Sequence, residues 1–403
     1  MKSDPRNSIF IRCCYGYAVS GMAVLVIGAI LPSIIKEAGI SFLAAGGLLS
    51  VMAIGNLSSS FIFPLIVPIM GKRKAITLVT LFVPSSLLVL SFLPPLPVLY
   101  GIMLLYGFTR GCITILNNAT VSDIYGDASI SKLNILHCSF AIGAFLAPLL
   151  TAALMKFGIG WKITLYLIVI LTIISALSYG TMNYDFISEA QKEIEKRKNK
   201  SGNQTKGNRE FLRSFAFYCI AFILFFYLGV ENCINGWFVT YLQNTGVMSA
   251  EFATTLVSLT WLVIMGGRLI CAAISKKMHR STILLINSLG SAACFFVLIS
   301  AHNLPLITAS LLGLGFFLAG IYPTCIANAG PLIQGSTFGM SLLTAISAMG
   351  GIITPQMVGG VADRVGIVGA IGILVFNVMF VIVLSAVNFK IWHKKKKNGV
   401  AYE

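Results

Sequence analysis

Twelve long apolar stretches dominate this sequence, and they restrict the chain to folds that are stable in a lipid bilayer. A helix that crosses the hydrocarbon core needs about 20 consecutive, mainly apolar residues, whereas a membrane-spanning strand shows about 10 residues of alternating polarity. The stretches have the first pattern and not the second. They cover residues 10–33, 42–69, 75–94, 97–122, 131–156, 162–181, 214–243, 251–273, 281–300, 304–328, 334–360 and 366–391. The sequence therefore predicts an all-α polytopic membrane protein with twelve transmembrane helices.

Positive charge is distributed as the topology of such a protein requires. Only 10% of the residues are charged, yet the formal net charge is +16, a value that would also suit a nucleic-acid-binding protein. The basic residues do not gather on a soluble domain, however. Most fall at the two ends of the chain and in the loops that share a side with those ends. Because cytoplasmic segments carry the excess of Lys and Arg, we expect both termini in the cytoplasm, a location in the cell membrane and no nucleic-acid partner.

The longest polar segment divides the apolar stretches into six and six. It extends from about Asn183 to Arg213 and contains a charged run followed by the Gly- and Asn-rich run 201–208. We predict an N-terminal six-helix half over 1–185, a basic cytoplasmic linker over 186–213, a C-terminal six-helix half over 214–392 and a basic cytoplasmic tail over 393–403.

The fifth apolar stretch of each half contains the same Gly-to-Pro spacing. The first copy runs from Gly143 to Pro148, and the second from Gly350 to Pro355. Each proline interrupts the backbone hydrogen bonds of its helix at a matching depth. The match indicates that the two halves are related copies, as they commonly are in transporters.

Several chemical signatures are missing from the sequence. It contains no Gly-x-x-x-x-Gly-Lys-Ser/Thr phosphate loop, so an ATP-driven pump is not expected. No Cys/His cluster has metal-ligand spacing, and the segments between the apolar stretches are too short to fold a catalytic domain. We therefore expect no enzyme activity, no metal site and no cofactor, apart from protons as a coupling ion. The expected partners are the lipid bilayer and a small molecule, and the expected oligomeric state is a monomer.

Glu231 is the one acidic residue that lies deep inside an apolar stretch. A charge at that depth costs roughly 3 kcal/mol even on the gentlest scale, so it needs a partner, a proton or a water-filled cavity. Asn235 lies four residues further on and shares its helical face, and Trp237 offers a flat ring with a polar tip. Acid, amide and indole together suit a sugar, whose hydroxyl groups need paired donors and acceptors when they leave water.

A second polar face is predicted in the fourth apolar stretch. Arg110, Thr114 and either Asn117 or Asn118 recur at helical spacing, so they share one side of the helix. Arg110 fits either a structural pair, with Glu231 or with backbone carbonyls, or direct contact with the substrate.

Five further side chains in the apolar stretches can form hydrogen bonds or ion pairs. His137, about two turns into the fifth stretch, fits either a proton relay or an ordinary histidine bonded between packed helices. Tyr322, Asn328 and Gln356, in the tenth and eleventh stretches, are additional candidates for substrate contact. Arg268 is near the inner end of the eighth stretch, and we expect it to face the cytoplasmic loop.

Several of these segments resemble one family. Lys132 to Pro148 is similar to its fifth-helix motif Leu-Asn-x-x-His-x-x-Phe-Gly-x-Gly-Ala-x-x-x-Pro, and Gly229 to Trp237 is similar to its Gly-x-Glu segment in the seventh helix. The segments 320–324 and 350–363 resemble its tenth and eleventh helices. On these motifs the chain resembles the major facilitator superfamily and, within it, the fucose/glucose/galactose:proton symporter family, over nearly its whole length.

The resemblance implies the major facilitator fold, and it implies that His137, Glu231 and Asn235 lie near a sugar cavity. It also matches Asn118 to the residue that ends the family's fourth-helix pattern. That pattern then puts Thr114 where an acid is usual, and the first helix lacks the Asp that some members use. Proton coupling therefore falls to Glu231, with His137 as the second candidate.

The sequence favours a hexose-type transporter that works by alternating access, in which Glu231 binds a proton together with the sugar because burial disfavours a charged carboxylate. Uniport of the same sugars, without a coupled proton, is an alternative. Three other functions are left open. The first is transport of an acidic sugar or organic anion clamped by Arg110, the second is multidrug:proton antiport, and the third is a non-transporting sensor. The expected site residues are Arg110, Asn117, Asn118, His137, Glu231, Asn235, Trp237, Tyr322, Asn328 and Gln356.

Overall fold

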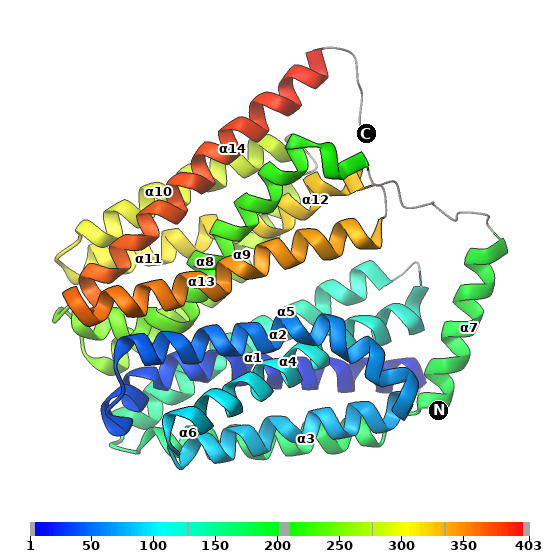
Figure 1. The fold of residues 1–403 in the computed structure, drawn as a ribbon, viewed down its shortest axis with the longest axis horizontal. Helices are drawn as coiled ribbons and strands as arrows, with labels where there is room; N and C mark the ends of the chain where they lie inside the picture. The colour runs from blue at the N-terminus through cyan, green and yellow to red at the C-terminus, as the bar shows by residue number, and fades with distance from the viewer. Residues whose placement is uncertain (1–4, 127–128, 201–209, 276, 334–335, 398–403) are drawn as a thin grey trace. The chain divides into compact units, whose positions relative to one another are not determined.

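The computed structural model describes residues 5–126, 129–200, 210–275, 277–333 and 336–397, and these residues form helices joined by short turns (Figure 1). The contacts divide the chain into two units, Met1–Gln204 and Thr205–Glu403. The first unit contains α1 (Pro5–Ala38), α2 (Phe42–Met70), α3 (Lys72–Ser91), α4 (Leu96–Tyr125), α5 (Ser129–Lys156), α6 (Trp161–Gly180) and α7 (Tyr184–Lys200). The second contains η2 (Glu210–Arg213), α8 (Phe215–Asn244), α9 (Ala250–Ile274), α10 (Arg280–Ser300), α11 (Leu304–Leu318), α12 (Ile321–Ile333), α13 (Thr337–Ala370), η3 (Ile371–Ile373) and α14 (Leu374–Lys397).

The predicted all-α fold is confirmed, with a difference in the tenth span. α1 to α6 provide the first six spans, and α8, α9, α10, the α11–α12 pair, α13 and α14 provide the rest. The tenth span was expected to be continuous, but it breaks between Leu318 and Ile321. Pro323 has no N–H to give to the carbonyl of Ala319, so the helix cannot run through this point undisturbed. Gly366, with a φ of 76°, separates the eleventh span from the twelfth.

Glycine lets one pair of helices in each unit approach closely. In the first unit α1 packs on α5, and a Cβ atom at Gly143 would lie 1.8 Å from the carbonyl oxygen of Ala18. In the second unit α8 packs on α13, and a Cβ atom at Gly350 would lie 1.8 Å from the carbonyl oxygen of Phe225. The two glycines of the predicted repeat therefore have the same role, because each allows backbone contact in its own unit.

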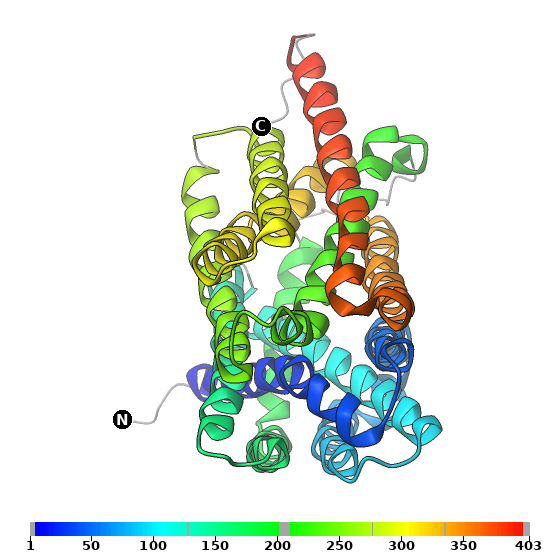
Figure 2. The ribbon, with the colours of Figure 1, turned by 90° about the vertical axis from the view of Figure 1, so that its left-hand side faces the viewer.

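Buried polar side chains hold α8 in place within the second unit. α14, red in Figure 2, packs on both α8 and α10. The side-chain amide of Asn377 in α14 donates to the hydroxyl of Thr354 in α13 and to the carbonyl of Phe226 in α8, at 3.2 Å in each case. Since an unpaired buried polar group is costly, these bonds favour one rotation of α8 about its axis. That rotation decides which α8 side chains face α9 and α12.

The predicted linker begins as helix α7, which packs against the first unit. Ile187 is fully buried, and the hydroxyl of Tyr184 donates to the carbonyl of Tyr179 at 2.8 Å. Burial raises the pKa of Tyr184 above its ordinary value, so the hydroxyl keeps its proton at neutral pH. The division at Gln204 falls inside the predicted linker 186–213. Residues 201–209 of that linker and 398–403 of the predicted tail lie outside the described residues.

The contact at Gly143 gives a test of the packing. Gly143→Ala places a methyl group against the backbone of α1, and we expect it to lower the free energy of unfolding by about 1–3 kcal/mol, the usual cost of overpacking. Thermal unfolding of the purified protein in detergent measures this. Gly101→Ala is the control, because a Cβ atom there would meet no other atom within 4 Å. Equal melting temperatures for the two variants would contradict this account of the α1–α5 contact.

Candidate functional site

Glu231 lies in the middle of α8, and the residues one turn away on each side share its face. Tyr227 precedes it by four residues and Asn235 follows it by four, so the three side chains follow one stripe of the helix. Tyr227 is fully buried, and its hydroxyl donates to Oε1 of Glu231 at 3.0 Å. The carboxylate therefore accepts a hydrogen bond from its own helix.

Arg268 of α9 supplies the positive charge closest to this carboxylate within the unit. Its Nη2 lies 3.9 Å from Oε1 of Glu231, a loose ion pair in which the side chains are 36% and 18% exposed, respectively. The expectation that Arg268 faces the cytoplasmic loop was wrong, because the side chain turns towards α8. This distance is longer than a hydrogen bond, and the Nε atom of Arg268 makes no hydrogen bond to a described residue.

Aromatic side chains from two other helices complete the surroundings of Glu231. Trp261 of α9 donates its indole N–H to Oδ1 of Asn235 at 3.2 Å. The ring of Tyr322 in α12 lies 6.2 Å from that of Tyr227. We refer to Tyr227, Glu231, Asn235, Trp261, Arg268 and Tyr322 as the Glu231 cluster.

The structure gives Trp237 a packing role instead of a place in this cluster. The side chain is fully buried, and its indole N–H donates to the carbonyl of Pro355 in α13 at 3.0 Å. Its ring is therefore not open to stacking on a ligand. Among the described residues, no hydrogen bond or ion pair connects Asn328 or Gln356 with the Glu231 cluster either.

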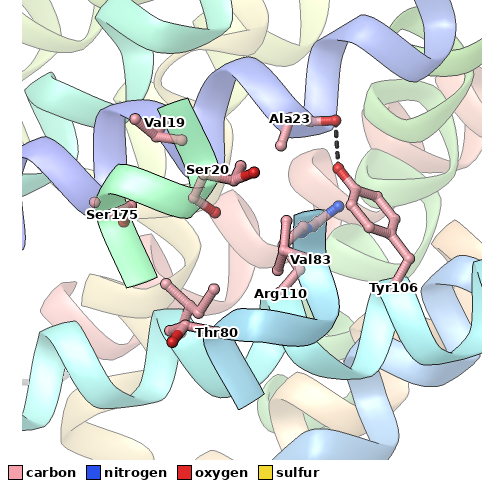
Figure 3. A pocket seen from close by; sticks show the side chains of 11 residues that line it. Val19, Ser20, Ala23, Thr80, Val83, Tyr106, Arg110 and Ser175 are labelled. Atoms are coloured by element: carbon pink, nitrogen blue, oxygen red, sulfur yellow. Dashed lines mark hydrogen bonds between the residues drawn. The ribbon is translucent and has the colours of Figure 1, made fainter. Parts of the chain in front are cut away.

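The first unit places Arg110 inside its own helix bundle. Arg110 and Tyr106 of α4, Ser20 of α1 and Ser175 of α6 line a cavity of about 20 Å³ between α1, α3, α4 and α6 (Figure 3). The hydroxyl of Tyr106 donates to the carbonyl of Ala23 across it. A space of this size holds about one water molecule.

The other predicted residues of the first unit fall into two groups. Asn117 is fully buried, and its Oδ1 accepts a hydrogen bond of 2.9 Å from the hydroxyl of Tyr179, so it joins α4 to α6. His137 is exposed on α5, with the ring of Tyr17 edge-on at 5.4 Å, and Asn118 is partly buried. His137 and Asn118 therefore keep a surface that a ligand can reach, whereas Asn117 does not.

Three members of the Glu231 cluster are not among the site residues expected from the sequence: Arg268, which was expected to face the cytoplasmic loop, and the two aromatic residues Tyr227 and Trp261. Tyr227 lies one turn before Glu231, and Trp261 lies seven residues, or about two turns, before Arg268. Helical spacing from each charged residue would have found both. No group of three or more potential metal-ligating side chains comes together in the part of the chain that the structure describes.

Comparison of the sequence and the fold with known proteins identifies the family of this chain. The family model of the Major Facilitator Superfamily matches residues 13–331. The chain belongs to the Major Facilitator Superfamily. As a superfamily member it is a multi-pass membrane transporter, and its family and fold are those of transporters, not of enzymes.

Two relatives of this facilitator match it over most of its length. It is 24% identical over 361 residues to the glucose/mannose transporter GlcP of Bacillus subtilis, a match that covers 87% of this chain and 86% of the relative. It is 22% identical over 392 residues to Bypass of stop codon protein 6 of Saccharomyces cerevisiae, covering 89% and 77%.

Solved structures show the same fold. A D-xylose-proton symporter superposes with a TM-score of 0.76 at 14% identity, over 96% of this facilitator and 98% of that chain. The nucleoside transporter NupG superposes with a TM-score of 0.72 at 14% identity, over 96% and 99%. The predicted major facilitator fold is therefore confirmed.

A double-mutant cycle tests the pairing of Glu231 with Arg268. Arg268→Gln removes the cation beside a half-buried carboxylate, and we expect it to lower the free energy of unfolding by about 1–3 kcal/mol, less than for a fully buried pair because both side chains are partly exposed. Adding Glu231→Gln removes the uncompensated charge and restores most of that loss. Thermal unfolding in detergent measures the four proteins, with exposed Arg364→Gln as a charge-matched control. A double variant no more stable than Arg268→Gln would contradict the pairing.

Proposed function

We propose that this facilitator is a secondary active transporter that moves a hexose-type sugar across the cell membrane by alternating access, with Glu231 as the proton carrier. The observation that carries the proposal is the loose ion pair between Glu231 and Arg268, which lies within one unit and beside hydrogen-bonding aromatic and amide groups. The proposal treats the monomer as the working unit and, in keeping with the distribution of basic residues, places both termini in the cytoplasm.

The chemistry of the Glu231 cluster supports a polyhydroxylated ligand. A sugar that leaves water must replace each hydrogen bond of its hydroxyl groups, so its site needs donors and acceptors side by side. Glu231 and Asn235 supply acceptors, Arg268 and the Asn235 amide supply donors, and the cluster adds aromatic rings for the apolar face of the sugar. The glucose/mannose transporter among the relatives agrees with this substrate class.

Protonation of Glu231 offers a direct link to substrate binding. In the ionised state the carboxylate attracts Arg268 and accepts the Tyr227 hydroxyl. A proton removes the attraction between Glu231 and Arg268 and turns one carboxyl oxygen into a donor. The freed guanidinium and the new donor are then available to sugar hydroxyls, so proton and sugar favour the same state. In this scheme release of the proton on the inside restores the pair and weakens sugar binding.

In the first unit, the predicted residue His137 is exposed and Asn118 is partly buried, so both keep a surface that a ligand can reach. Arg110 is partly buried beside a cavity of about 20 Å³ in its own unit, so the proposal does not depend on the alternative in which it clamps an acidic sugar or another organic anion. In the proposal His137 is the second candidate for binding the proton, after Glu231.

Transport by the purified protein in liposomes tests the proposal. We expect an inward proton gradient to drive accumulation of a labelled hexose, and unlabelled neutral hexoses to compete where a sugar acid does not. In Glu231→Gln the gradient no longer drives accumulation, because the amide cannot carry a proton, but exchange of labelled for unlabelled sugar continues. Glu251→Gln, the same change at the first turn of α9, should behave as the wild type.

Two outcomes would contradict the proposal in different ways. Hexose uptake that ignores the gradient in the wild type and is normal in Glu231→Gln would mean uniport. Uptake of organic cations or sugar acids in place of hexoses would overturn the substrate class itself.

A further inference from the structure

A second cavity lies at one end of the second unit, apart from the Glu231 cluster. It has a volume of about 190 Å³, and its walls come from the turn between α9 and α10, the last part of α12 and the end of α14. Asn328, which lines it, is six residues beyond Tyr322 along α12, or about 9 Å at 1.5 Å per residue. The cavity has room for roughly six water molecules at ~30 Å³ each, enough for a small polar ligand.

Arg280 is fixed at the edge of this cavity by an irregularity in α12. Pro331 has no N–H, so the carbonyl of Ala327, four residues earlier, has no helical donor. The guanidinium of Arg280 replaces it, with Nη1 donating to that carbonyl at 2.8 Å. Arg280 makes no further hydrogen bond or ion pair with any residue that the structure describes. One N–H thus positions the group, and the others remain available.

Asn328 is a buried polar residue of this cavity whose side-chain amide nitrogen lacks a hydrogen-bond partner among the described residues. Its side chain is 2% exposed. Leaving such a group unsatisfied costs about 1–3 kcal/mol. Asn328 also lines the cavity, so its unsatisfied amide lies beside the space that a polar ligand would fill.

The charge around the cavity favours an anion. The described lining residues include Arg280 and the ring of His279 and no Asp or Glu. Lys277 lies in the same turn. α10 also starts at Arg280, so the positive end of its dipole is at this edge.

We propose that this cavity binds a phosphate group, held by the free N–H groups of Arg280 and by the amide of Asn328. A guanidinium matches two phosphate oxygens at once, and a buried amide adds a donor that surface lysines lack. Inorganic phosphate and the head group of an anionic lipid share this chemistry. The site is independent of sugar transport and adds a ligand that the Glu231 cluster does not recognise.

Thermal unfolding of the purified full-length protein tests the site with inorganic phosphate as the probe. We expect phosphate to raise the melting temperature of the wild type in a saturable way. Arg280→Gln keeps a donor for Ala327 but loses the charge, and Asn328→Asp keeps the side-chain shape but replaces the donor by repelling oxygens. Each should raise the apparent dissociation constant about tenfold or more. Arg213→Gln, an exposed arginine of the same unit, should bind as the wild type.

A second arm distinguishes a lipid head group from free phosphate. The same proteins are placed in phosphatidylcholine nanodiscs with and without phosphatidic acid. Stabilisation by phosphatidic acid that both site variants lose, with a weak response to inorganic phosphate, identifies the lipid as the occupant. Melting temperatures without either probe show whether the variants fold. The proposal is overturned if neither probe stabilises the wild type, or if folded site variants respond as the wild type does in both arms.

Discussion

A carboxylate in the middle of a membrane span is stable only beside a cation, a proton or water, and the second unit is arranged around this requirement. α9 supplies Arg268 at 3.9 Å from Glu231, and α8 itself supplies the hydroxyl of Tyr227. Neither contact is as tight as a buried structural ion pair would need to be. In the proposed mechanism Glu231 alternates between two states, one ionised beside Arg268 and one protonated without it, as the exchange of a proton on each cycle requires.

Close helix packing places these side chains. The glycines of the repeated Gly-to-Pro segment, Gly143 and Gly350, each let one helix touch the backbone of its partner in its own unit. In the second unit this contact, together with the buried bonds of Asn377, fixes the face that α8 presents. One face carries Glu231 and Asn235 towards α9 and α12. The glycines of the repeated segment therefore serve helix packing. The position of the Glu231 cluster in the second unit depends on the close contact that Gly350 allows.

Much of the fold follows from the sequence, because membrane spans are long and their glycines and prolines have local effects. The sequence also predicts that Glu231 and Asn235 share a face, since residues four apart on a helix do so. It does not predict the rotation of one helix against another. Trp237 is six residues from Glu231, about 120° away around the helix at ~100° per residue, and therefore packs on α13 instead of facing a ligand. Arg268 differs from expectation for the same reason, as it turns towards a neighbouring helix that the sequence alone does not place.

The most direct test of whether Glu231 couples protons to sugar is a measurement of the protons that the protein takes up or releases when it binds sugar. The purified protein is mixed with a saturating hexose in weakly buffered detergent solution near neutral pH, and the change in pH is recorded. The account predicts that the wild type takes up a proton when sugar binds, so that the pH rises, and that Glu231→Gln binds sugar with no such change. Sugar binding without proton uptake in the wild type, or with the same uptake in Glu231→Gln, would contradict it.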